Sequence, residues 1–242
     1  MIGRPSSAPV RSKDEGEKPF WISFADLMTA MMVLFLVVLV SSLVSLTKRI
    51  NEAEAKEKTR TAEIATMCHR LELDIAKVNP RVKIDCKDNR INFGEAGRFE
   101  NGKFVLDQQG DQALIDVVPL ILLAADSPEG KKWMRQVIIE GFASRKGAYL
   151  FNLNLSLQRS QWVMCRLLSN ASDTALTPQQ KKDIRRLFLT GGVSFSNAKE
   201  DEAASRRVEM RLNFYGLNDG NQRELDQSIA DNIENGVCSL KP

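Results

Sequence analysis

The chain has 242 residues with a formal net charge of +3, and 43% of its residues are apolar. This length suffices for one well-packed domain with additional segments, and the near-neutral charge gives no indication of a nucleic-acid-binding protein. The single histidine and the four cysteines form neither a C-x-x-C pair nor a cluster with metal-ligand spacing, so we expect no metal site.

The first predicted element is a transmembrane helix at residues 20–46, whose only charged side chain is Asp26. A bilayer core of about 30 Å requires about 20 apolar helical residues, and this segment supplies them. Its long apolar core favours a retained anchor over a signal peptide. The basic tail at residues 1–19 favours a cytoplasmic N-terminus, but Lys48 and Arg49 beyond the helix weaken this signal, so charge alone leaves the orientation open.

Asp26 is the residue in this segment that most needs an explanation. A carboxyl group inside a bilayer is costly unless it faces protein or a water-filled path. Because aspartate is too short to reach the interface easily, we interpret Asp26 as a titratable ion carrier rather than as a charge that extends to the surface. Thr29 lies one turn away, and we expect it to hydrogen-bond with Asp26. Small and β-branched side chains that permit close helix packing share its stripe, namely Ser23, Ala30, Val33, Val37, Val40 and Val44.

The run ADLMTAMM at residues 25–32, followed by LFLV at 34–37, resembles the single transmembrane helix of MotB-type stator subunits. In that family the aspartate carries the translocated ion. The resemblance therefore implies that Asp26 carries H⁺ or Na⁺, with no other cofactor. It also implies that two copies of the chain sit inside a ring of a multi-span MotA-like membrane protein.

Residues 47–79 are charged and rich in Ala, Glu and Lys, and they predict a helical stalk that Asn79-Pro80 ends. A mostly apolar four-three series from Leu46 to Val78 indicates the seam of a parallel coiled coil. A solvated linker helix explains the same composition, and both interpretations stay open.

We expect residues 80–215 to form an α/β domain of the α+β sandwich type, followed by a polar tail at 216–242. A regular alternation of apolar and polar side chains near its end predicts a half-buried strand, and Thr177-Pro178 predicts the cap and first turn of a helix. The expected strands lie at 81–87, 90–95, 136–141 and 208–214, and the expected helices at 108–125, 153–169 and 178–189.

The domain also resembles the OmpA-like peptidoglycan-binding pattern, whose usual form is G-H-T-D, then G, Y-N, L-S, R-A and V. Here the pattern reads GFAS at 141–144, then Gly147, FN at 151–152, LS at 155–156, RS at 159–160 and Val163, and SRRVE at 205–209 resembles its N-R-R-V-E motif. The resemblance implies a peptidoglycan-binding role for Ser144, Phe151, Asn152, Leu155, Arg159 and Arg206.

One departure from this pattern affects the ligand. In the family the motif Asp and Arg bind diaminopimelate, and Arg159 matches the Arg, a planar fork suited to a stem carboxylate. Ser144 occupies the Asp position, which removes the partner of the stem's ammonium group, so we expect wall binding that is weaker, altered or dependent on another acid. For Asn152 a loop brace is the alternative role, and for Arg206 and Arg207 structural salt bridges.

A wall-binding domain implies a single-pass inner-membrane protein with a periplasmic C-terminal domain. The periplasm is oxidising and permits disulfides. Cys165 with Cys238 is one candidate pair, and the pairing of the four cysteines stays open.

The short chain, the GFAS variant and the charged stalk resemble the ZorB subunits of Zorya anti-phage systems more than flagellar stators. That resemblance implies a ZorA-like ring as partner and a role in defence. A flagellar MotB-type subunit and a passive envelope tether without ion flow are the alternatives. We expect no enzyme, because the sequence shows no nucleophile–base constellation.

Overall fold

The computed structural model describes residues 18–169, 176–219, 238 and 240, so most of the two predicted tails lies outside the described residues. The chain divides into two units, Met1–Ala55 and Lys56–Pro242. Helix α1 (Lys18–Val78) contributes residues to both units.

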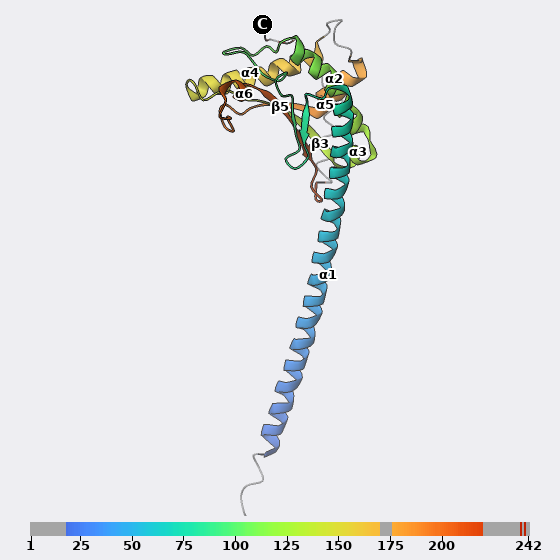
Figure 1. The fold of residues 1–242 in the computed structure, drawn as a ribbon. Coiled ribbons are helices and arrows are strands. Elements are labelled where there is room, and N and C mark those ends of the chain that lie inside the picture. Colours follow the sequence, from blue (N-terminus) through green and yellow to red (C-terminus); the bar gives the residue numbers. More distant parts are fainter. Residues whose placement is uncertain (1–17, 170–175, 220–237, 239, 241–242) are drawn as a thin grey trace, which may run out of the picture. The chain divides into compact units, whose positions relative to one another are not determined.

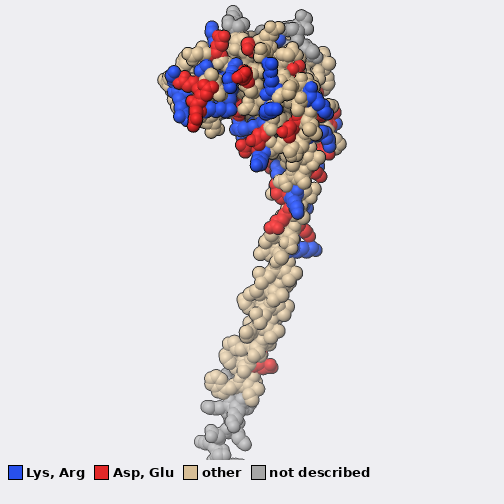
Figure 2. Space-filling model, in the orientation of Figure 1, with Lys and Arg blue, Asp and Glu red and all other residues tan. Residues whose placement is uncertain are grey.

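The first unit consists, in its described part, of the N-terminal portion of α1. This helix is long and apolar enough to cross a membrane. Its side chains from Trp21 to Ile50 are exposed, and Figure 2 shows a long surface of this helix that is almost free of charged groups. A helix that is apolar on all sides is stable only in an apolar surrounding, which agrees with the predicted transmembrane segment at 20–46.

The second unit is built on a five-stranded sheet with the order β1-β2-β5-β3-β4 (Figure 1). The pairs are antiparallel except β3 with β4, which are parallel. The strands are β1 (Lys83–Asp85), β2 (Arg90–Asn92), β3 (Met134–Gly141), β4 (Phe188–Gly192) and β5 (Val208–Phe214). The remaining helices are α2 (Gln108–Asp126), α3 (Pro128–Trp133), α4 (Tyr149–Leu168), α5 (Pro178–Leu187) and α6 (Glu202–Ser205).

The core lies between one face of the sheet and the helices. The apolar side chains Val208, Met210 and Leu212 of β5 are buried there, as expected of a strand with one face on a core, while Glu209 between them is buried on the other face. Helix α2 adds a continuous apolar stripe that is almost fully buried. The predicted α/β sandwich fold is confirmed by this arrangement. The central core residues are Ile91, Ala113, Val117, Val118, Ile121, Val137, Ile139, Val163, Ile184 and Met210.

The C-terminal part of α1 belongs to this core, a result that the sequence did not predict. Met67, Leu71 and Ile75 are buried against the domain, and Ile64 is buried beside them. The second half of the predicted coiled-coil seam therefore packs within its own chain and not against a second helix. The domain includes α1 residues from 56 onward, so it begins well before the expected boundary at residue 80.

Polar contacts also attach α1 to the domain. The carboxylate of Glu63 accepts hydrogen bonds from Lys132 Nζ at 2.7 Å and from Trp133 Nε1 at 2.5 Å. These two donors lower the pKa of Glu63. One turn earlier, Arg60 Nε donates to the carbonyl oxygen of Tyr215 at 2.8 Å. The contacts fix the rotation of the helix on the domain in addition to its apolar packing.

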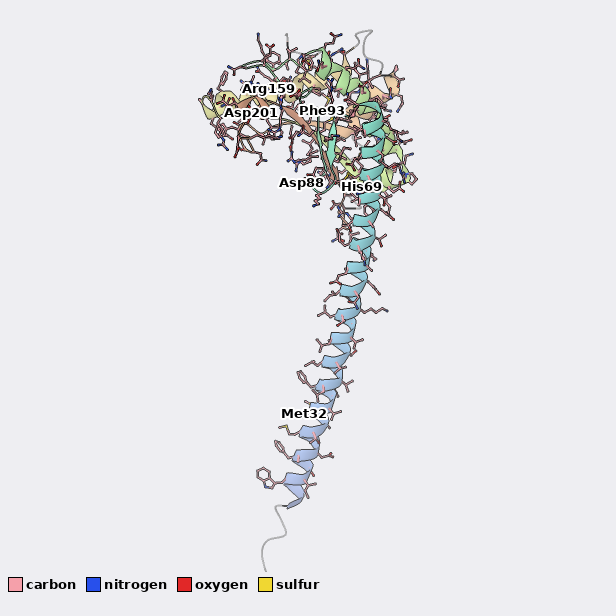
Figure 3. The ribbon with its side chains drawn as sticks, viewed as in Figure 1. Met32, His69, Asp88, Phe93, Arg159 and Asp201 are labelled. Carbon is pink, nitrogen blue, oxygen red and sulfur yellow. A yellow bond between two sulfur atoms is a disulfide. The ribbon has the colours of Figure 1, made fainter. Side chains whose placement is uncertain are left out.

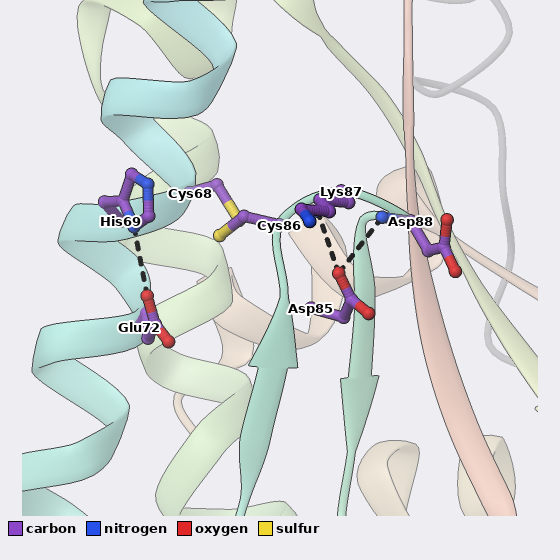
Figure 4. Close-up of a disulfide and its surroundings, with 7 residues drawn as sticks. All are labelled: Cys68, His69, Glu72, Asp85, Cys86, Lys87 and Asp88. Atoms are coloured by element: carbon purple, nitrogen blue, oxygen red, sulfur yellow. Dashed lines mark hydrogen bonds and ion pairs between the residues drawn. A yellow bond between two sulfur atoms is a disulfide. The ribbon is translucent and has the colours of Figure 1, made fainter.

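Two disulfides cross-link the second unit. Cys165–Cys238 joins α4 to the C-terminal segment, which confirms the candidate pair. Cys68–Cys86, which was not predicted, joins α1 to the turn after β1, and Figure 4 shows His69 and Glu72 beside it. Because the Cys86 sulfur is bonded to Cys68, it is not available as a thiolate ligand that could bind a metal ion together with His69 and Glu72.

The strand β4 replaces the end of a predicted helix. The helix expected at 178–189 begins as predicted, with a capping box between Thr177 and Gln180, but it ends at Leu187. Phe188 starts β4, pairing with Val137 of the buried strand β3. The prediction was wrong here because α5 passes into β4 without a turn residue that would mark the boundary. The pairing of β4 with β3 is a long-range contact, which a local sequence pattern does not reveal.

Replacing Leu71 by Ala should destabilise the second unit by about 2–5 kcal/mol, because this side chain is 2% exposed and its loss leaves a cavity. Leu73, two residues away on the same helix and 64% exposed, provides the control, and Leu73→Ala should change stability by no more than about 0.5 kcal/mol. Denaturant unfolding of the full chain in detergent, followed by tryptophan fluorescence, measures both. Equal effects would mean that α1 does not pack on the domain.

Candidate functional site

The first candidate site is Asp26 on the apolar part of α1. The hydroxyl of Thr29 donates to the backbone carbonyl oxygen of Asp26 at 2.9 Å. The expected contact between these residues therefore exists, but Thr29 bonds the backbone and not the carboxylate. Asp26 is exposed in the isolated chain, on the same helical stripe as Ala30 and Val33. The carboxylate is thus presented on a surface that a neighbouring membrane helix can cover.

The second candidate site begins where β3 ends. Phe142 N donates to the carbonyl of Arg207 at 2.9 Å, and Ala143 N donates to the carbonyl of Ser194 at 2.8 Å. These bonds hold the segment between the start of β5 and the loop after β4. Ser144 follows directly and is 7% exposed. The predicted binding position Ser144 therefore lies in an ordered, nearly closed part of the domain.

Helix α4 approaches this segment closely because of a glycine. A Cβ atom on Gly141 would lie 2.0 Å from the carbonyl oxygen of Ser156, so no other residue fits there. The hydroxyl of Ser156 accepts the backbone N–H of Ser194 at 3.1 Å and connects α4 to the loop after β4. The G…LS spacing of the motif thus has a packing reason that is independent of any ligand.

Asn152 braces the loop that precedes α4. Its Nδ2 donates to the carbonyl of Lys146 at 2.9 Å, and its side chain is buried. Gly147, with φ of +103°, supplies the backbone conformation that the turn requires. Leu155 is buried, whereas Phe151 is 60% exposed. Of these three predicted residues, only Phe151 presents a large surface to a ligand.

Arg159 is fully buried, with 0% exposure, and its guanidinium binds three backbone carbonyls. Nη1 donates to Phe142 at 2.6 Å, Nε to Lys103 at 3.0 Å and Nη2 to Glu100 at 3.5 Å. Burial, and then the nearby charge of Arg206, lower the pKa of Arg159 to about 10. Arg159 therefore ties the loop at 99–103 to the end of β3, and its guanidinium lies beneath the surface.

Arg206 is the more accessible cation of the pair. It is half-buried, and its Nε donates to the carbonyl of Phe99 at 3.2 Å. The Arg159 guanidinium lies 4.9 Å from the centre of the Phe99 ring, so both cations contact the same residue. Within the described residues neither has an ion-pair partner within 4 Å. Figure 3 places Arg159 and Asp201 in the same part of the domain, well away from His69.

Arg207 has a different role from its neighbour. Its guanidinium lies 4.0 Å from the centre of the Phe142 ring, and its Nε binds Glu209 at 2.7 Å in a buried ion pair. Glu209 also binds Arg90 on β2 at 3.1 Å. Of the two alternatives that the sequence left open for Arg207, the structure shows the structural salt bridge.

The sequence predicted residues that the structure brings together in this region, but it did not predict the atoms that hold them in place. The carbonyls of Glu100 and Lys103 satisfy Arg159, and a carbonyl is present in every residue, so no side-chain pattern reveals its role. The Phe99-x-x-Gly102 spacing resembles the entry loop of the OmpA-like pattern, and it is a signal that could have indicated the position of this loop.

Comparison with known proteins gives two sequence matches. The family described as membrane MotB of the proton-channel complex MotA/MotB matches residues 6–55. The Zorya protein ZorB of Escherichia coli O139:H28 is 54% identical over 242 residues, covering 99% of this chain and 98% of that protein. The chain belongs to the ZorB family. The resemblance stated from the sequence is thereby confirmed for the family.

Solved structures similar to this ZorB-family chain are periplasmic and OmpA-like domains. The periplasmic domain of Helicobacter pylori MotB is 16% identical with a TM-score of 0.39, covering 62% of this chain and 89% of that one. The OmpA-like domain of FopA1 from Francisella tularensis is 16% identical with a TM-score of 0.36, covering 56% of this chain and 82% of that one.

Replacing Arg159 by Lys should destabilise this ZorB-family domain by about 2–4 kcal/mol, because one ammonium group cannot reach three carbonyls and leaves buried acceptors unsatisfied. Arg206→Lys is the same charge-conserving exchange at a half-buried position, and it should cost less than about 1 kcal/mol. Denaturant unfolding of the full chain in detergent measures both. Equal, small losses would contradict the anchoring role of Arg159.

Proposed function

We propose that this chain is the wall-anchored subunit of an ion-driven motor in the bacterial inner membrane. The N-terminus would be cytoplasmic and the second unit periplasmic. One observation carries the proposal: Asp26 is the only charge in the apolar segment at residues 20–46. That segment lies within residues 6–55, which the MotB family matches in this ZorB-family chain. An intramembrane acid is a functional feature by default, because its burial is costly.

The ion step follows from the position of Asp26. A carboxylate that binds a proton becomes neutral, and its attraction to a neighbouring helix changes with each binding and release. Moving one charge through 100 mV supplies about 2.3 kcal/mol, enough to bias a conformational step. We take the ion to be H⁺. Two copies of the chain would stand within a ring of a MotA- or ZorA-like membrane protein, and Thr29 would hold the helix backbone beside the acid.

The wall contact would use the second unit. Arg206 offers an accessible guanidinium to the carboxylate of a peptidoglycan stem, and the buried charge of Arg159 supports it from below. Ser144 and the exposed ring of Phe151 would border the ligand, while Asn152 and Leu155 hold the loop and the helix in place. The role of the chain would thus be anchoring and ion conduction rather than enzymatic catalysis.

Because the similar E. coli protein is a Zorya protein, we assign the motor to anti-phage defence. The test compares phage plating on cells that carry this gene and its neighbours with cells carrying Asp26→Asn. Asparagine keeps the shape and cannot titrate, so protection should be lost at equal membrane levels of protein. Asp26→Glu keeps the carboxyl group and serves as the matched control.

Equal protection by wild type and Asp26→Asn would mean that Asp26 carries no ion and would favour a passive tether. If neither protects, the defence role is wrong, and swimming motility of the same pair then tests the flagellar alternative.

Wall binding is tested separately by sedimentation of the full chain with purified sacculi in detergent. Arg206→Ala should weaken binding about tenfold or more, since a charge-assisted hydrogen bond contributes about 1.5–3 kcal/mol. Lys87→Ala is the control, because Lys87 lies in the β1–β2 turn at the opposite end of β5 from Arg206. Equal binding by the two variants would contradict the assignment of Arg206.

A further inference from the structure

Four side chains with metal-binding donor atoms gather where α1 meets the turn between β1 and β2. A ring nitrogen of His69, a carboxylate oxygen of Glu72 and the sulfur of Cys86 all lie within 4.8 Å of one another. The sulfur of Cys68 is bonded to that of Cys86, which brings a fourth donor into the same cluster (Figure 4). Two sulfurs, one imidazole and one carboxylate therefore meet at one place in the domain.

Helix α1 brings three of these side chains together by its periodicity. Cys68 and Glu72 are four residues apart, and His69 and Glu72 are three apart, spacings that place side chains beside one another on a helix. Cys68 is fully buried at 0% exposure, whereas the side chain of His69 is 68% exposed, so the cluster lies at the edge of the core. Its outer side is open to water, and a dissolved ion can reach it.

Both sides of the cluster are held by contacts that do not involve the disulfide. On the helix side, Leu71 is buried in the core. On the turn side, the carboxylate of Asp85 accepts the backbone N–H groups of Lys87 at 2.9 Å and of Asp88 at 3.3 Å, and Cys86 lies within the segment that these bonds close. We therefore expect the cluster to stay assembled when the disulfide is reduced.

Reduction changes what the two sulfurs can bind. In the disulfide neither sulfur is a thiolate, so the cluster offers a metal only the imidazole and the carboxylate. A dithiol reductant supplies two electrons and two protons, becomes a disulfide itself, and leaves Cys68 and Cys86 as thiols. A cation that then binds displaces one proton from each thiol and is held by two thiolates.

The donor set favours one kind of metal. Thiolate, imidazole and carboxylate groups are the ligands that Zn²⁺ binds with tetrahedral geometry, whereas Mg²⁺ and Ca²⁺ require oxygen ligands. Neighbouring donors in such a zinc site are about 3.3–3.8 Å apart. His69 Nδ1 already lies 3.1 Å from a carboxylate oxygen of Glu72. The sulfur of Cys86 needs to approach this pair by only about 1 Å, a movement that side-chain rotation supplies.

We infer that the reduced chain binds one Zn²⁺ ion through Cys68, His69, Glu72 and Cys86. Exchange with a disulfide oxidant, which accepts two electrons, re-forms the S–S bond and releases the ion. Both states connect α1 to the turn between β1 and β2, one through the metal and the other through the S–S bond. The chain is made with free thiols, so the site is available between folding and oxidation. The inference is independent of the ion-carrying and wall-binding roles proposed above.

The test measures Zn²⁺ binding by the full chain in detergent through competition with a chromophoric zinc chelator. The chain is measured as a disulfide and after reduction with a phosphine, because a dithiol would itself chelate zinc. The reduced chain should bind one ion per chain, and the oxidised chain should leave the zinc on the chelator. Co²⁺ in place of Zn²⁺ should give the charge-transfer absorption of thiolate ligands with the reduced chain.

Variants locate the bound ion. Cys165→Ser combined with Cys238→Ser removes the other disulfide and should keep zinc binding in the reduced state. His69→Ala and Glu72→Gln each remove one exposed ligand and should weaken zinc binding by at least about tenfold. Asp74→Asn is the matched control, because it removes a carboxylate from the same helix outside the cluster, and it should leave the zinc affinity unchanged.

A second measurement shows whether the ion binds the folded chain. Zinc should raise the denaturant midpoint of the reduced chain and leave that of the oxidised chain unchanged, because only a ligand of the folded state stabilises it. Three results overturn the inference. They are zinc binding that is equal in the reduced and oxidised chains, zinc binding that disappears with Cys165 and Cys238, and a reduced chain whose midpoint zinc does not raise. Equal zinc affinities of His69→Ala, Glu72→Gln and Asp74→Asn overturn it as well.

Discussion

The buried guanidinium of Arg159 is the interaction on which the C-terminal domain depends most. A buried charge without compensation is very costly, so its three carbonyl acceptors must be in place whenever the domain is folded. This requirement connects α4, the end of β3 and the loop at 99–103. Arg206 then binds the carbonyl of Phe99 and acquires a fixed position on the same loop. The two guanidinium groups are therefore positioned by the folded domain itself.

Helix α1 meets two different requirements along one continuous element. Its N-terminal portion is apolar on all sides, as a segment surrounded by lipid must be. Beyond residue 56 only one face is apolar, and that face packs on the domain through Met67, Leu71 and Ile75. The four-three spacing that indicated a coiled coil is the same spacing that any helix needs to bury one face. Periodicity identifies the buried face but not the partner that covers it.

The sequence predicted those parts of the molecule that depend on local patterns. The membrane helix follows from a long apolar run, the strand β5 from its alternation of apolar and polar side chains, and the family from motifs of fixed spacing. It did not predict β4 or the Cys68–Cys86 bond, because both depend on contacts between distant segments. At the site, the motif pointed to Arg159, but the sequence did not predict that this side chain is buried, because its partners are backbone atoms. The roles of Asp26 and of the wall-binding residues stay predictions.

The Cys68–Cys86 disulfide also determines how mechanical force enters the domain. A pull along α1 from its N-terminal side first strains the contacts of Arg60 and Glu63. At Cys68 the tension divides, and one branch passes through covalent bonds into the turn between β1 and β2. The helical turns from Cys68 to Val78 lie inside the covalent ring that this disulfide closes, so a pull on α1 does not detach them from the domain directly. The resistance of this domain to such a pull thus depends on a covalent bond and the sheet behind it, in addition to side-chain packing.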